Sequence, residues 1–244
     1  MNIYRQIQES REKQKLFSVL IDPDRYQQRD LLKMIDQSVE TGVDFFLVGG
    51  SLISHPIEPV ISLIKSHGNI PVLLFPGSLL QISPAADAIL LLSLISGRNP
   101  EFLIGNHVVA APLLHRTRME IIPTGYMLIG NQTSTSVEYI SNTRPIPSEK
   151  TDIAVATALA GEMLGLKLIY LEAGSGAPGT VPGEMIRQVK DHISVPLIAG
   201  GGIRSVKTLE SVYRAGADMA VVGNAFENKP GLLKEMAAVK RDFL

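Results

Sequence analysis

Glycines follow two short apolar runs late in the sequence. The run 195–199 leads into Gly200, Gly201 and Gly202, and the run 219–222 leads into Gly223 and Asn224. Unbroken β-branched and aliphatic runs are typical of strands buried in a parallel sheet. Glycine after such a strand allows positive φ and lets backbone N–H groups approach an anion. Each turn alone also fits a tight strand–helix connection, but two on consecutive strands predict a phosphate site.

Carboxylate side chains follow two other apolar runs. Asp22 and Asp24 come after the run 16–21, and Glu172 comes after the run 168–171. Carboxylates are Mg²⁺ ligands, although Asp in a turn is also a common cap. We expect Glu172 in the mouth of a site, as an acid–base group or in an ion pair across the mouth. Glycine N–H groups beside carboxylates that hold Mg²⁺ suggest a substrate with two phosphate-bearing parts.

All these residues stand where a predicted strand ends, in a chain that alternates strands with helices. Strands are predicted at 16–21, 44–48, 70–75, 88–92, 120–129, 167–171, 195–199 and from 219 onward. The third connection contains Pro84 and predicts a truncated or replaced helix. Pro123 with Gly125 predicts a bulge or an irregular edge in the fifth strand. A chain of 244 residues with this alternation predicts a (β/α)₈ TIM barrel, modified around its third helix. In such barrels the active site lies at the carboxyl ends of the strands, and phosphate binds after strands 7 and 8.

Composition limits the class of protein. No linker divides the chain, so we predict a single TIM-barrel domain over 1–244, with a polar loop inserted at the rim over 130–148. A net charge of −1 gives no reason to expect nucleic acid, and the absence of cysteine excludes disulfides and thiolate metal sites. The polar start is unlike a signal peptide, and no apolar run reaches the length of a transmembrane helix. We expect a soluble, cytoplasmic protein.

Five segments, spread over nearly the whole chain, resemble the geranylgeranylglyceryl phosphate synthase family. They are LIDPDR at 20–25, FFLVGGS at 45–51, LIYLEAGSGAPG at 168–179, AGGGIRS at 199–205 and VVGNAF at 221–226. AGGGIRS alone occurs in many phosphate-binding barrels, whereas the five together are specific. The LIDPD form and the AGSG turn resemble the longer-chain group of the family. Leu20 stands where the shorter-chain group, which includes bacterial heptaprenylglyceryl phosphate synthases, tends to carry a lysine.

The resemblance implies transfer of a prenyl group, geranylgeranyl in particular, from an isoprenyl diphosphate to the 3-hydroxyl of sn-glycerol 1-phosphate, with release of pyrophosphate. It implies Mg²⁺ at Asp22 and Ser51, and Glu172 as the general base. The implied glycerol-phosphate contacts are Tyr170, Leu171, Glu172, Ala173, Gly174, Ser175, Gly176, Gly201, Gly202, Gly223 and Asn224. The sequence contains no DDxxD motif of the helical prenyl synthases. A prenyl tail needs a long apolar groove, which strands 3 and 4 with their thin third connection can leave open.

Two other functions use the same phosphate turns. A sugar-phosphate isomerase or epimerase needs a second acid–base group across a small polar pocket. A non-catalytic phosphate-binding barrel predicts Glu172 turned away from the mouth and no metal-competent carboxylate. A long apolar groove leading from the rim favours the prenyltransferase. Exposed apolar helix faces, where present, would fit a homo-oligomer.

Overall fold

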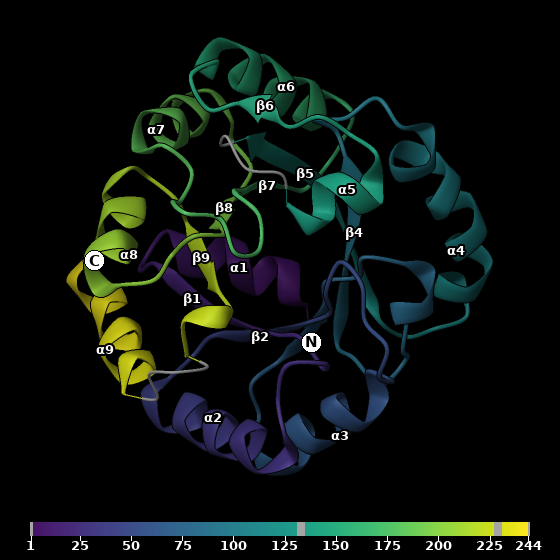
Figure 1. Cartoon of the computed structure of the whole chain (residues 1–244), viewed down its shortest axis with the longest axis vertical. Coiled ribbons are helices and arrows are strands. Elements are labelled where there is room, and N and C mark those ends of the chain that lie inside the picture. The colour runs from purple at the N-terminus through teal and green to yellow at the C-terminus, as the bar shows by residue number, and fades with distance from the viewer. Residues whose placement is uncertain (1, 131–134, 227–230, 244) are drawn as a thin grey trace.

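Parallel strands close into a barrel in the computed structural model, which describes residues 2–130, 135–226 and 231–243 (Figure 1). The barrel strands are β1 (Leu16–Ile21), β2 (Phe45–Val48), β3 (Val72–Leu74), β4 (Ala88–Leu94), β5 (Glu120–Gly130), β7 (Leu168–Glu172), β8 (Leu197–Gly200) and β9 (Met219–Val222). Each pairs in parallel with the next, and β9 pairs with β1 to complete the ring. Of the nine strands described, β6 (Ile146–Pro147) pairs with β5 outside this ring. The predicted (β/α)₈ TIM barrel is confirmed.

Helices surround the ring and close one of its ends (Figure 1). The outer helices are α2 (Gln28–Thr41), α3 (Glu58–His67), α4 (Asn106–His115), α6 (Thr151–Met163), α7 (Gly183–His192), α8 (Val206–Arg214) and α9 (Leu232–Val239). Shorter turns are η2 (Glu101–Gly105), η3 (Asn224–Phe226) and η4 (Lys240–Phe243). The N-terminal helix α1 (Ile3–Arg11) lies across the amino-terminal end of the barrel, where Glu120 accepts the Ile3 and Tyr4 N–H groups. No helix within the described ranges is long and apolar enough to cross a bilayer.

The strands are buried on both faces, which explains their unbroken apolar runs. In β2, for example, Phe45 and Leu47 belong to the apolar cluster inside the barrel. Phe46 and Val48 belong to the cluster between barrel and helices. Because successive side chains of a strand point to opposite faces, a site can be formed by inward-facing residues toward the carboxyl ends of the strands and by the loops beyond them.

The third connection lacks a full helix, as predicted. It holds only the 3₁₀ turn η1 (Leu79–Gln81) between β3 and β4. The following strand β4 is less completely covered than β3, since Leu91, Leu92 and Ser93 are only half-buried.

The predicted bulge in the fifth strand is wrong. β5 pairs with β4 without interruption from Ala88–Glu120 to Leu94–Tyr126. Pro123 still accepts the Lys167 N–H through its carbonyl at 2.8 Å, so the missing proline N–H does not break the ladder. A β-carbon at Gly125 would lie 2.8 Å from Ile169 Cδ1. This glycine therefore makes room for core packing rather than for a bulge.

The predicted rim loop at 130–148 contains regular structure. It carries the helix α5 (Ser136–Ser141) and the strand β6, and residues 131–134 lie outside the described residues. Thr135 and Glu138 form a capping box at the start of α5, and Asn142 ends it in the left-handed region at φ 48°. A six-residue helix fixed by its caps gives too short a periodic pattern to be predicted.

Candidate active site

Glycine turns after β8 form one wall of a cavity at the carboxyl end of the barrel. Gly201 and Gly202 have φ values of 79° and 69°, in the region that favours glycine. A β-carbon at Gly202 would overlap the Gly179 carbonyl, and one at Gly201 would overlap Glu172 Oε1. Glycine is therefore required for the β8 turn to pass this close to both neighbours.

The turn after β7 meets the turn after β9 across the same cavity. Gly174 and Gly176 have φ values of 99° and 80°. Asn224 Nδ2 donates to Ser175 Oγ at 3.2 Å, which joins the two turns. Arg204 Nη2 donates to the Gly176 carbonyl at 2.9 Å and places a guanidinium beside the glycines. Backbone amides and a cation on one wall suit a phosphate group.

Glu172 ends β7 inside this cavity, with 6% of the residue exposed. Its Oε1 accepts the Gly174 N–H at 2.7 Å. Burial raises the pKa of Glu172 to about 7, since the Gly174 N–H and the Tyr170 hydroxyl only partly stabilise the charged form. A carboxyl group with this pKa can take up a proton near neutral pH.

Asp22 and Ser51 line the same cavity from the loops after β1 and β2, the two strands that follow β9 around the ring. Asp22 Oδ1 accepts the Asp24 N–H at 3.0 Å, and Oδ2 lies 3.2 Å from Arg25 Nε. A β-carbon at Gly50 would lie 3.2 Å from Asp22 Oδ2, so this carboxylate lies against the loop that carries Ser51. No cluster of three or more His, Cys, Asp or Glu that could hold a metal occurs among the described residues. One carboxylate and one hydroxyl fit a Mg²⁺ ion that takes its other ligands from substrate phosphates and water.

Asp24 does not line the cavity. Its carboxylate accepts the Ser54 N–H at 2.7 Å, the Ser54 hydroxyl at 2.8 Å and the His55 N–H at 2.9 Å, and it pairs with His55 Nδ1 at 2.7 Å. These hydrogen bonds hold the pKa of Asp24 far below its usual range. These contacts tie the β1–α2 loop to the β2–α3 loop, and because Asp24 lies outside the cavity lining its carboxylate is not placed to bind a metal there.

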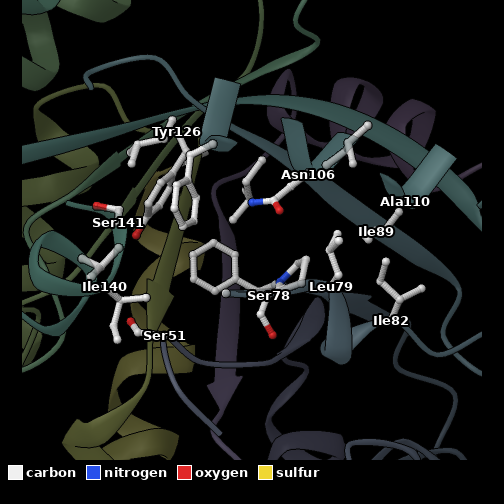
Figure 2. Close-up of a pocket in the computed structure, with 18 of the residues that line it drawn as sticks. Ser51, Ser78, Leu79, Ile82, Ile89, Asn106, Ala110, Tyr126, Ile140 and Ser141 are labelled. Atoms are coloured by element: carbon white, nitrogen blue, oxygen red, sulfur yellow. The ribbon is translucent and has the colours of Figure 1, made fainter. Parts of the chain in front are cut away.

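An apolar groove of about 100 Å³ lies beside η1 (Figure 2) and adjoins the main cavity of about 350 Å³. The two share the lining residues Gly50, Ser51, Phe75, Tyr126 and Val137. In Figure 2, Tyr126 and Ser51 lie on one side of the groove, and Ile89 and Ala110 lie on the other. The rest of the groove is lined mainly by aliphatic side chains of β4 and η1, together with residues of α4. The groove therefore lies where the thin third connection leaves β3 and β4 uncovered.

Three aromatic rings mark the region where groove and cavity meet. The Phe75 ring stacks on Tyr170 at a centroid distance of 5.2 Å, and Tyr126 meets both rings edge-on at 5.7 and 5.4 Å. Burial raises the pKa of both tyrosines well above the usual value, so they stay neutral. Neutral aromatic faces at this place can stabilise a positive charge that develops nearby.

Most predicted site residues line the main cavity. They are Asp22, Ser51, Tyr170, Glu172, Gly174, Ser175, Gly176, Gly201, Gly202, Gly223 and Asn224. Leu171 and Ala173 do not: both side chains pack in the apolar layer between barrel and helices, because alternate residues face away from the mouth. Arg25, Tyr126 and Arg204 line the cavity but were not predicted. Arg204 directly follows the AGGGI segment, so its position beside the phosphate turns was a usable signal.

Comparison with known proteins agrees with this geometry. A family model described as the PcrB family matches residues 6–240. The geranylgeranylglyceryl phosphate synthase of Spirosoma linguale is 52% identical, over 94% of this chain and 92% of that protein. The protein of the same name from Thermococcus kodakarensis is 44% identical, over 91% and 88%.

Solved structures show the same similarity. The crystal structure of (S)-3-O-geranylgeranylglyceryl phosphate synthase from Thermoplasma acidophilum, in complex with its substrate sn-glycerol-1-phosphate, has a TM-score of 0.94 and 32% identity. Its alignment covers 99% of both chains. A thiamine phosphate pyrophosphorylase from Pyrococcus furiosus, at 14% identity and a TM-score of 0.58, shares the fold alone. From the match over most of its length, this chain belongs to the PcrB family.

Proposed function

We propose that this protein joins an isoprenyl diphosphate, geranylgeranyl diphosphate in particular, to the 3-hydroxyl of sn-glycerol 1-phosphate. The observation that carries the proposal is that two unlike spaces lie side by side and share lining residues. Glycine turns suited to a phosphate line the cavity, and the space next to it is an apolar groove. The relatives' name and the bound substrate of the Thermoplasma acidophilum structure support the choice of glycerol phosphate and prenyl group.

The reaction forms one bond and breaks one bond. The glycerol 3-hydroxyl oxygen bonds to the first carbon of the prenyl chain, and the bond from that carbon to the diphosphate oxygen breaks. Glu172 accepts the hydroxyl proton, and pyrophosphate leaves with the electron pair. An allylic carbon bound where groove and cavity meet would lie near the rings of Phe75, Tyr126 and Tyr170, which can stabilise the positive charge it develops. The protein mainly orients the two substrates, because allylic diphosphates ionise readily once the leaving group is neutralised.

Asp22 and Ser51 are the residues that would hold Mg²⁺. When bound, the ion neutralises the charge of the departing pyrophosphate. Asp22→Asn is expected to reduce turnover strongly while glycerol phosphate still binds at the glycine turns. Activity that persists in this variant, or that is undiminished in EDTA, would rule out the metal assignment.

The isomerase alternative is less well supported by the site. It needs a second acid–base group across a small polar pocket, whereas Asp22 is paired with Arg25 and the adjoining space is an apolar groove. The non-catalytic alternative predicts Glu172 turned away, whereas Glu172 is buried in the cavity wall.

We further propose that the protein works in the cytoplasm as a homo-oligomer. Four apolar side chains of η2 and α4 are between 49% and 67% exposed: Ile104, Val108, Val109 and Leu113. A second copy covering this face would remove them from water. Sedimentation equilibrium tests this, and a purely monomeric protein would contradict it.

The function is tested by incubating the protein with Mg²⁺, sn-glycerol 1-phosphate and labelled isoprenyl diphosphates of several lengths. The expected product is an organic-soluble phosphate ester, formed only when both substrates are present. Interconversion of sugar phosphates without such a product would favour the isomerase instead.

A further inference from the structure

Gln81 is a buried amide on the thin third connection of the barrel. Only 1% of the residue is exposed, although its neighbour Leu80 is 94% exposed. Gln81 Oε1 accepts the Gly50 N–H at 3.2 Å and the Gly77 N–H at 3.1 Å, and Nε2 donates to the Gly50 carbonyl at 2.7 Å. One side chain therefore bridges the loop after β2 and the loop after β3.

Burying an amide is costly unless hydrogen bonds replace those made to water. Here each of the two side-chain heteroatoms has a backbone partner, and two of the three bonds go to Gly50. An apolar side chain would fill the same space without needing partners. The amide therefore fixes the positions of the two loops that it joins, in addition to filling space in the third connection.

The backbone that Gln81 holds is the one that carries Ser51. Gly49 has a φ of 149°, and a β-carbon there would overlap the Phe75 carbonyl, so this loop is packed directly against β3. On its other side, Gly50 lies against the carboxylate of Asp22. Gly50 is thus fixed between Asp22 and Gln81.

The far end of the same loop has its own anchor. Asp24 holds Ser54 and His55 through the contacts described above. Ser51 lies between the two anchors, and no hydrogen bond of its own side chain is needed to keep it facing the cavity.

We propose that Gln81 is a positioning residue for the metal–diphosphate half of the site. It fixes the positions of Gly50 and Ser51 relative to Asp22 and Gly77. The part of the cavity that receives Mg²⁺ and the diphosphate therefore has its final shape before the substrate binds. Preorganisation of this kind increases affinity because the loop need not be ordered on binding. The inference rests on the proposed function, because it assigns the diphosphate to this wall.

The test replaces Gln81 with Met, which has a similar length and no hydrogen-bond donor. Calorimetric titration with inorganic pyrophosphate and Mg²⁺ is expected to show a Kd raised by about tenfold, because the loop that carries Ser51 is no longer held in place before binding. Titration with sn-glycerol 1-phosphate is expected to give an unchanged Kd, because the glycine turns after β7, β8 and β9 do not touch Gln81. In turnover, the KM for the isoprenyl diphosphate should rise while that for glycerol phosphate stays constant.

Ser38→Ala is the matched control for a general loss of stability. Ser38 is fully buried on α2, and its hydroxyl donates to the Met34 carbonyl at 2.7 Å, away from both cavities. It should lower the Tm without changing either Kd. Hydrogen exchange adds a second measurement: amides of residues 49–55 should exchange faster in Gln81→Met, and those of residues 174–179 should not.

Equal weakening of both ligands, or unchanged binding of pyrophosphate, would overturn the positioning role. If Gln81→Met does not fold, Gln81→Glu keeps both acceptor contacts and loses the donor to Gly50, and the same selective loss of pyrophosphate binding is expected. A wild-type protein that binds both ligands but forms no prenyl ether would refute the proposed function, whereas selective loss in the variant would still support the role of Gln81 in pyrophosphate binding.

Discussion

At the scale of single residues, the site depends on one buried carboxyl group. Glu172 was predicted to lie in the mouth because it follows an apolar strand and precedes a glycine turn, and the structure places it there. Its raised pKa could not be predicted from the sequence, since it results from the packing of the β8 turn against the carboxylate.

The contiguous segment 170–176 is an imperfect guide for a related reason. Its members Leu171 and Ala173 face the helices, as the alternation of a strand requires. A resemblance to a family assigns roles to every residue of a matching segment, whereas only alternate side chains of a strand face the cavity. Arg25 was missed because a cation near a turn has no fixed spacing to identify it, whereas Arg204 could have been found from its place directly after the AGGGI segment.

Glu172→Gln tests the general base. The amide keeps the shape and can still accept the Gly174 N–H, but it cannot take up the hydroxyl proton. We expect kcat to fall by about 10²–10⁴-fold with both KM values little changed. The kcat/KM of the wild type should fall as pH drops below about 7, because the base must be ionised. An unchanged kcat with a raised KM for glycerol phosphate would make Glu172 a binding residue.

Gly223→Ala tests the phosphate wall without disturbing the fold. Its φ lies outside the left-handed region, and a β-carbon there would lie 3.5 Å from Leu20 Cβ, an ordinary contact. The added methyl group would lie against Leu20, which lines the cavity together with Gly223, so the KM for glycerol phosphate should rise by about tenfold while that for the isoprenyl diphosphate changes little. Gly183→Ala, at the start of α7 and outside the cavity, is the control. Equal effects on both substrates would contradict this assignment of the wall.

At the scale of elements, the third connection determines what the barrel can bind. Its missing helix was predicted from Pro84 and the short stretch around it, and this prediction is confirmed by η1. The prediction of a bulge in β5 is wrong for a physical reason. Pro123 and Gly125 are compatible with a bulge and also with close packing, and the neighbouring side chains Ile95 and Ile169 decide between the two. The capped helix α5, which contributes Ile140 and Ser141 to the groove, is too short for periodicity to reveal.

Ala110→Phe tests whether the groove holds the prenyl chain. Ala110 lies on α4 with 4% exposure and lines the groove, so a phenyl ring would fill its far side. We expect the KM for geranylgeranyl diphosphate to rise by about tenfold relative to that for the shorter farnesyl diphosphate. Ala156→Phe, at an exposed position of α6 that lines neither the groove nor the cavity, should change neither. The same loss for both chain lengths would place the prenyl group elsewhere.

At the scale of the whole molecule, barrel closure brings together groups from distant parts of the chain. Asp22 from β1 and Glu172 from β7 are 150 positions apart in the sequence and line one cavity. The order of strands was predictable from the alternation of apolar runs. How the groove and the cavity join depends on Tyr126 and Phe75, which were not predicted because their inward orientation depends on the register of the closed sheet.

Stability should depend on pH through Glu172. Its pKa in the folded protein, about 7, is above the usual value of 4.5, so the folded state binds the proton more tightly than the unfolded chain does. The contribution to stability is therefore full below pH 4.5 and is lost as pH rises through about 7. Urea unfolding at several pH values should show the free energy of unfolding of the wild type falling across this window relative to that of Glu172→Gln. Parallel curves for the two proteins would contradict the raised pKa.

In the proposed mechanism the glycerol 3-hydroxyl oxygen attacks the prenyl carbon. The fate of this oxygen is followed by mass spectrometry after sn-glycerol 1-phosphate that carries heavy oxygen at the 3-hydroxyl is incubated with Mg²⁺ and geranylgeranyl diphosphate. The mechanism predicts that all of the label appears in the ether of the lipid product and none in the released pyrophosphate. Label in the pyrophosphate, or a product in which the prenyl group is bonded to a phosphate oxygen, would contradict it.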